Sequence, residues 1–168
     1  MSGKLTGASR LFLALSMVAT FAGGTAMSQS VSPDWIDVSV GNLLTLRAPP
    51  GTVFQRQSGT DSFVGNLRGP GFVLHLDYGL FSPRPPDQAG LINQTVQELN
   101  LDDKPAKIVS GGVVASSPPK YFIGLYMADL RSPTASNPSS LAIYAELPTT
   151  DQDPLIRAIF TTIRFARR

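Results

Sequence analysis

Apolar and polar residues alternate along much of the chain beyond residue 42, and this period of two predicts β-strands with one buried face. The clearest example is the segment 72–78. One of its faces carries Phe72, Leu74, Leu76 and Tyr78, and the other carries Val73, His75 and Asp77. Patterns of the same kind predict further strands at 44–48, 52–57, 62–68, 95–101, 106–111 and 141–147.

Short turn sequences separate several of these predicted strands. Gly69-Pro70-Gly71 lies between two of them, and glycine and proline at such a point favour a hairpin. The sequence Asp102-Asp103-Lys104-Pro105 predicts a second hairpin in the same way. We therefore expect antiparallel pairing on both sides of each turn.

The segment 121–130 is apolar on both faces, unlike the others. Tyr121 and Ile123 begin one face, and Phe122 and Gly124 begin the other. This composition is typical of a strand that is covered on both sides. We therefore expect 121–130 to be a central strand.

The C-terminal region predicts an amphipathic helix. Asp153 is expected to cap it, and Pro154 suits the first helical position because the N–H it lacks would have no partner there. Arg157, Thr161 and Arg164 are expected to point away from the core. The apolar stripe that must be buried against the sheet consists of Leu155, Ile156, Ile159, Phe160 and Ile163.

These elements predict one α+β domain over residues 42–165. Its mainly antiparallel sheet would have about six to eight strands, with the C-terminal amphipathic helix packed on one face. Residues 29–41 are expected to form an irregular lead-in. The chain contains no cysteine, so neither a disulfide nor a thiolate site enters this prediction.

The first 28 residues have the three parts of a secretory signal peptide. Lys4 and Arg10 precede an apolar run of twelve residues, and small residues follow it. The run is too short for a transmembrane span, which needs about 20 apolar residues. Cleavage is expected after Ala26 or after Ser28, since small residues precede both sites. The protein is therefore expected to be secreted or periplasmic, with no stable membrane span after cleavage.

Removal of this signal peptide changes the charge balance. The full chain has 14 basic and 12 acidic side chains, and the first 28 residues hold two of the basic ones and no acidic one. The mature part then has 12 of each, which gives a formal net charge of zero. Nucleic-acid binding depends on net basicity, so no nucleic-acid partner is expected.

Three stretches resemble uncharacterised bacterial exported proteins: LLTLRAPPGTVFQR, DSFVGNLRGPGFVLHLDYGLFS and DPLIRAIFTTIRF. Their strand order and closing helix are similar to the Mog1/PsbP-like fold, and the resemblance covers residues 42–165. It implies an antiparallel sheet flanked by helices, used mainly for protein binding and accessory roles rather than for catalysis. It assigns no catalytic or binding residue.

His75 is the only histidine in the chain, so any histidine-dependent catalysis must use it. It shares a predicted strand face with Asp77, and Ser62 lies on the neighbouring strand of the hairpin. A serine-type hydrolase needs such a nucleophile, base and carboxylate within hydrogen-bond reach. Residues two apart on a strand are about 7 Å apart, and no Gly-x-Ser-x-Gly elbow is present. A small hydrolase is therefore the alternative function.

Asp61, Asp77, Tyr78 and Phe81 lie near strand ends beside turns, where binding residues are often found. The two aspartates also suit the fixing of turns through hydrogen bonds to backbone N–H groups. A binding groove or flat patch is expected to be lined by Tyr78, Phe81, Tyr121 or Tyr126.

No metal and no cofactor are expected. The acidic pairs Asp102-Asp103 and Asp151-x-Asp153 lack the spacing of a calcium loop, and turn and cap roles account for them. The sequence therefore predicts an exported, periplasmic, noncatalytic binding or accessory domain whose partner is an envelope protein.

Overall fold

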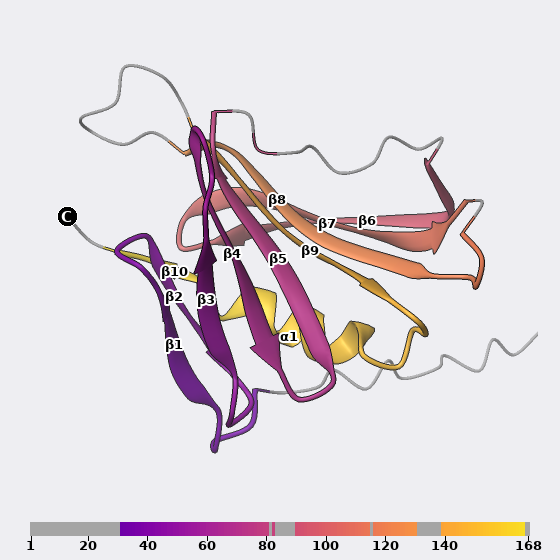
Figure 1. Ribbon diagram of the computed structural model, residues 1–168, viewed down its shortest axis with the longest axis horizontal. Helices are drawn as coiled ribbons and strands as arrows, with labels where there is room; N and C mark the ends of the chain where they lie inside the picture. The colour runs from indigo at the N-terminus through magenta and orange to yellow at the C-terminus, as the bar shows by residue number, and fades with distance from the viewer. Residues whose placement is uncertain (1–30, 81, 83–89, 115, 131–138, 167–168) are drawn as a thin grey trace, which may run out of the picture.

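A computed structural model describes residues 31–80, 82, 90–114, 116–130 and 139–166 of the 168-residue chain. The fold is predominantly β: strands hold 61% of the described residues and one helix holds 8% (Figure 1). A mainly antiparallel sheet with a helix near the C-terminus is thus confirmed. The elements are β1 (Ile36–Val40), β2 (Leu44–Ala48), β3 (Val53–Gln57), β4 (Ser62–Gly69), β5 (Phe72–Gly79), β6 (Leu91–Leu101), β7 (Lys104–Val113), β8 (Tyr121–Leu130), β9 (Ser139–Leu147), α1 (Asp153–Thr161) and β10 (Arg164–Phe165).

Seven strands form one antiparallel sheet in the order β3-β4-β5-β9-β8-β7-β6, and β1, β2 and β10 form a small second sheet. β8 lies between β9 and β7, which confirms that 121–130 is a central strand. Both predicted hairpins are also confirmed. β4 pairs with β5 from Gly69 and Phe72 onward, and β6 pairs with β7 from Leu101 and Lys104 onward, so the second turn holds only two residues.

The main core lies on the face of the large sheet that α1 covers, which we call the inner face (Figure 1). Every second residue of the central strands points into this core, as the alternation predicted. The small sheet adds its own apolar residues to the same core, and the buried face of α1 contacts both sheets. Residues of this core that are at most 1% exposed include Leu74, Ile123, Ile143, Ile156, Ile159 and Phe160.

Residues 36–40 form strand β1, although we expected an irregular lead-in there. The strand pairs with β2 over all five residues and buries Val38 and Val40 in the main core. Gly41, with φ at +56°, lets the chain reverse between the two strands. The segment alternates apolar and polar residues over five positions, as 44–48 does, so the signal for a strand was present in the sequence. Pairing with β2 and burial in the core stabilise the strand.

The start of α1 also differs from our expectation. The helix begins at Asp153 with Pro154 in its first turn, so Gln152 is the N-cap, and it makes no side-chain capping bond. The Asp153 carboxylate binds Arg157 and Tyr121 instead of capping the helix. Within the described ranges, no helix has both the length and the apolar character needed to cross a bilayer.

Candidate functional site

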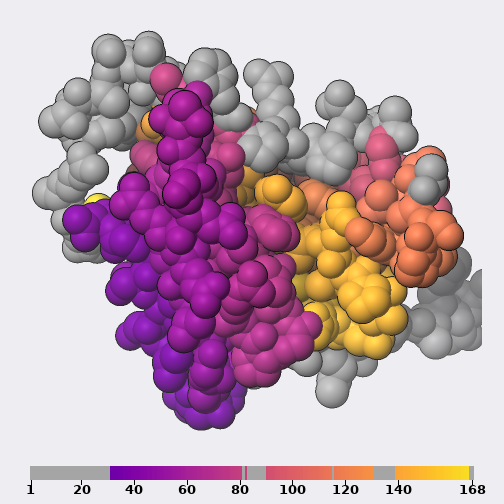
Figure 2. Space-filling view, in the orientation of Figure 1, coloured from indigo at the N-terminus to yellow at the C-terminus, as the bar shows by residue number. Residues whose placement is uncertain are grey.

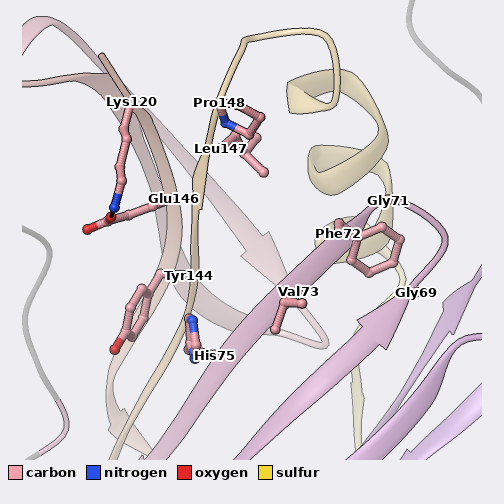
Figure 3. Close-up of a pocket in the computed structure, with 10 residues that line it drawn as sticks. All are labelled: Gly69, Gly71, Phe72, Val73, His75, Lys120, Tyr144, Glu146, Leu147 and Pro148. Atoms are coloured by element: carbon pink, nitrogen blue, oxygen red, sulfur yellow. Dashed lines mark hydrogen bonds and ion pairs between the residues drawn. The ribbon is translucent and has the colours of Figure 1, made fainter. Parts of the chain in front are cut away.

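An open cleft lies on the outer face of the large sheet, where β5 and β9 diverge (Figures 2 and 3). The ladder between these strands ends at the pair His75 and Tyr144. Beyond this pair the β4–β5 hairpin turns away from the end of β9, and a space of about 670 Å³ opens. This volume is in the usual range for ligand sites. The lining includes Val73, His75, Lys120, Tyr144, Glu146 and Pro148.

A row of aromatic rings forms the closed end of the cleft. The centroids of the His75 and Tyr144 rings are 5.4 Å apart, with the ring planes tilted by 35°. On the far side of β9, the ring of Phe122 lies 6.1 Å from that of Tyr144. Both separations are typical of favourable aromatic pairs. Phe122 is buried in a small outer cluster, so the row has a fixed end inside the protein and an exposed end at His75.

A buried asparagine orients the imidazole of His75. Nδ1 of His75 lies 2.9 Å from Oδ1 of Asn66, which is directly opposite on β4 and is only 4% exposed. An amide oxygen can only accept a hydrogen bond, so Nδ1 must donate it. In the neutral ring, Nε2 is then an acceptor that remains available to a ligand.

An ion pair forms the rim of the cleft. Nζ of Lys120 lies 2.7 Å from Oε2 of Glu146, and both side chains are 47% exposed. A pair with this exposure contributes at most about 1 kcal/mol to stability, so it is free to exchange partners with a ligand. The rim thus offers donors and acceptors without net charge.

The structure does not bring Ser62, His75 and Asp77 together. All three lie on the outer face, as the alternation implied, but Ser62 pairs with Gly79, four residues and about 13 Å along β5 from His75. Asp77 accepts a hydrogen bond of 2.9 Å from Oγ of Ser82 rather than orienting His75. Among the described hydrogen bonds, none joins two of the three predicted catalytic residues.

Three of the four predicted binding residues, Asp61, Asp77 and Tyr78, are not part of the cleft lining. Asp61 is exposed in the turn before β4, and Asp77 holds Ser82 at the end of β5. Tyr78 points inward and packs against the main core, and Phe81 lies outside the described residues. The strand geometry does not gather Asp61, Asp77 and Tyr78 at one place.

The predicted aromatic patch is divided between the two faces of the sheet. Tyr121 and Tyr126 are an odd number of residues apart on β8, so they point to opposite faces. The hydroxyl of Tyr121 donates a hydrogen bond to Asp153 on the inner face. Tyr126 belongs to the outer face, where its register partners are Lys107 on β7 and Ala142 on β9.

A second polar cluster, on the inner face, joins the helix to the sheet. Burial raises the pKa of the Tyr121 phenol, and the nearby Asp153 carboxylate raises it further. The hydrogen bond between Tyr121 and Ser110 has the opposite effect and lowers this pKa. For Arg157, burial favours the neutral form, but the hydrogen bond and charge of Asp153 outweigh it and raise the pKa of the guanidinium. Contacts within the fold occupy these groups, so they do not extend the cleft.

Of the residues that line the cleft, His75 was a predicted site residue; Val73, Lys120, Tyr144, Glu146 and Pro148 are among those that were not. Tyr144 and Glu146 lie on the polar face of the strand predicted at 141–147, and that alternation was the available signal. The signal could not locate the cleft, because β5 and β9 pair although the 59 residues 80–138 separate them in the chain.

The sequence matches no protein-family model and no curated protein. Among the residues that the structure describes, no group of three or more His, Asp or Glu side chains could hold a metal ion.

Proposed function

We propose that this protein is an exported, noncatalytic binding or accessory domain that holds its ligand in the cleft between β5 and β9. The observation that carries the proposal is the convergence of exposed His75, half-buried Tyr144 and the Lys120–Glu146 pair on one open cleft. Such a site offers an aromatic surface with a few polar groups around it, as ligand sites commonly do. In the described part of the chain, the hydrogen-bond partner of His75 is Asn66, and no serine or threonine hydroxyl takes its place.

Export to the periplasm, and an envelope protein as the partner, are part of the same proposal. The signal-like segment 1–28 supports export. The mature chain has no net charge, and the charged groups at the cleft rim neutralise each other. Both facts favour a neutral partner over a polyanion such as nucleic acid.

The α+β class and the likeness to the Mog1/PsbP-like fold also belong to this proposal. The α+β class is supported by the helix, because Ile156, Ile159 and Phe160 are completely buried and form part of the main core. The likeness is supported by the antiparallel sheet and the closing helix. One helix covers the sheet within the described ranges, whereas the resemblance implies flanking helices.

Site-specific photocrosslinking in intact cells tests the function. A benzophenone amino acid at Pro148, an exposed residue of the cleft, is expected to form an adduct with an envelope protein. The same probe at Gln57, exposed on the outer face of β3, is the matched control and should form none. Tyr144→Ala should abolish the adduct at Pro148. Equal adducts from both positions would contradict the proposal.

The hydrolase alternative has its own test. A fluorophosphonate probe labels an activated serine, and we expect it to leave Ser62 of the exported protein unlabelled. Labelling of Ser62 that disappears in His75→Ala would favour the hydrolase over the binding domain.

A further inference from the structure

Strand β6 forms one end of the large sheet, and in the described part of the chain only β7 pairs with it. β6 has eleven residues, whereas β3 at the opposite end of the sheet has five. The outer edge of a terminal strand presents a row of unpaired N–H and C=O groups, which can pair with another strand. The longer edge is therefore the stronger candidate for an interaction surface.

Few of the features that normally protect an edge strand are present on β6. A bulge between Ile92 and Thr95 interrupts its first part, but the ladder with β7 is continuous from Thr95 to Leu101. The single charged residue of the strand, Glu98, pairs with Lys107 of the same chain at 2.9 Å. β6 has no proline and no lysine, and these are the residues that most often block edge pairing.

The opposite edge is better protected. β3 is short, it carries exposed Arg56, and Pro49-Pro50 precede it. Each edge strand also has one prominently exposed valine: Val96 of β6 is 53% exposed and Val53 of β3 is 51% exposed. The two valines therefore provide a matched comparison between an open edge and a protected one.

We propose that β6 pairs antiparallel with β6 of a second copy of this chain, with Val96 opposite Val96. An isologous contact of this kind closes as a twofold dimer and joins two seven-stranded sheets into one. In a register centred on Glu98, the two Glu98 carboxylates would face each other. In a register centred on Gln97, Val96 of each copy would face Glu98 of the other. The register centred on Val96 pairs apolar with apolar and keeps the two Glu98 carboxylates apart.

Charge favours a second copy as the occupant of this edge. The mature chain has 12 basic and 12 acidic side chains, so two copies have no net repulsion to overcome. The only charge on the edge is neutralised within its own chain, by Lys107. Pairing along one strand buries less area than a standard stable interface, so the dimer should dissociate on dilution.

Single cysteines test this pairing cleanly, because the protein has no cysteine of its own. Under mild oxidation, the exported protein with Val96→Cys is expected to form a disulfide-linked dimer at least about tenfold faster than Val53→Cys, since a disulfide requires Cα atoms about 4.4–6.8 Å apart. Glu98→Cys should react at the slow rate. Equal rates for Val96→Cys and Val53→Cys, or faster reaction of Glu98→Cys, would overturn the proposal.

Sedimentation equilibrium provides the second measurement. The unmodified exported protein should show a concentration-dependent dimer, Val96→Lys should be monomeric, and Val53→Lys should retain the dimer. Circular dichroism checks that both variants are folded. A monomer at all concentrations up to about 1 mM, beyond the weakest affinities of specific contacts, would overturn the pairing. If Val96→Cys formed a disulfide with a different protein and none with a second copy of itself, the proposed dimer would likewise be overturned, and the partner of β6 would be a strand of that other protein.

Discussion

Tyr121 and Asp153 join the sheet to the helix, because the phenol of Tyr121 donates a hydrogen bond of 2.8 Å to Oδ2 of Asp153. Tyr121 begins β8 and Asp153 begins α1. The same carboxylate pairs with Nε of Arg157 at 2.5 Å, and Nη2 of Arg157 donates to Oγ of Ser110 at 2.6 Å. Ser110 is completely buried on β7. The first turns of the helix are thus fixed to two strands by charge-assisted hydrogen bonds.

Removal of the Asp153 carboxylate should therefore destabilise the fold. Asp153→Ala leaves the part-buried Arg157 without its anion and Tyr121 without its acceptor, so we expect the free energy of unfolding to fall by about 2–3 kcal/mol. Glu98→Ala is the control, because the Glu98–Lys107 pair is exposed and solvent screens it, so its removal should cost much less. Urea denaturation measures both, and equal losses would contradict this account.

Stability should also decrease at alkaline pH because of Tyr121. Burial, with a further contribution from Asp153, raises the pKa of Tyr121 above its unfolded value of about 10. The folded protein then keeps a proton that the unfolded chain loses, so this contribution is complete below about pH 10 and is lost as the pH rises further. Urea midpoints at about pH 8 and about pH 10.5 should differ more for the wild type than for Tyr121→Phe. Identical differences would exclude Tyr121 as the cause.

Local patterns predicted the strands well because burial of one face imposes a period of two on the sequence. β5 and β8 were placed this way, and the apolar stripe of α1 was identified by its helical period. Arg157 was wrongly expected to point away from the core. The helical period predicts the direction of the Cβ atom of Arg157 only. The rest of this long side chain reaches beyond the helix, and its guanidinium donates a hydrogen bond to Ser110 on β7.

The cleft was beyond prediction because it depends on which strands are neighbours. His75 was singled out as a candidate site residue because it is the only histidine in the chain. Its partner Tyr144 lies on β9, which pairs with β5 although a long stretch of chain separates the two strands. The sequence contains no signal for the point at which that ladder stops. Asn66, which orients His75, is only a polar residue of a predicted strand in the sequence. The register of β4 and β5, which places it opposite His75, is needed to reveal its role.

The burial of α1 makes Phe160 the strongest test of the core. Phe160 is completely buried, so Phe160→Ala should lower the free energy of unfolding by about 3–5 kcal/mol through lost burial and a new cavity. Leu155 lies on the same helix but is only partly buried, and Leu155→Ala should cost less. Chemical denaturation of both variants checks the order, and a smaller loss for Phe160→Ala would contradict the packing of the helix.

The proposed export predicts a defined mature N-terminus. Mass spectrometry of the protein recovered from outside the cytoplasm should show cleavage after Ala26 or after Ser28. Replacement of Ala26 by a large charged residue, as in Ala26→Arg, should block or displace processing, because Ala26 is next to the first cut and two residues before the second. Gln29→Arg lies beyond the residues that both sites require to be small and serves as the control. Retention of the whole segment in the exported protein would contradict this reading.

The two-residue turn between β6 and β7 predicts opposite outcomes for neighbouring aspartates. Asp102 and Asp103 both have positive φ, 49° and 62°, a conformation that glycine adopts with less strain. Asp103→Gly should therefore raise the free energy of unfolding by about 0.5–1 kcal/mol.

Asp102 has a second role, because its Oδ2 accepts a hydrogen bond of 2.9 Å from the backbone N–H of Phe165 and so holds β10. Asp102→Gly relieves the same strain but leaves that N–H without its charged acceptor, which costs about 1.5–3 kcal/mol. The two substitutions should thus shift the urea midpoint in opposite directions. A stabilising Asp102→Gly would show that the contact with Phe165 contributes nothing.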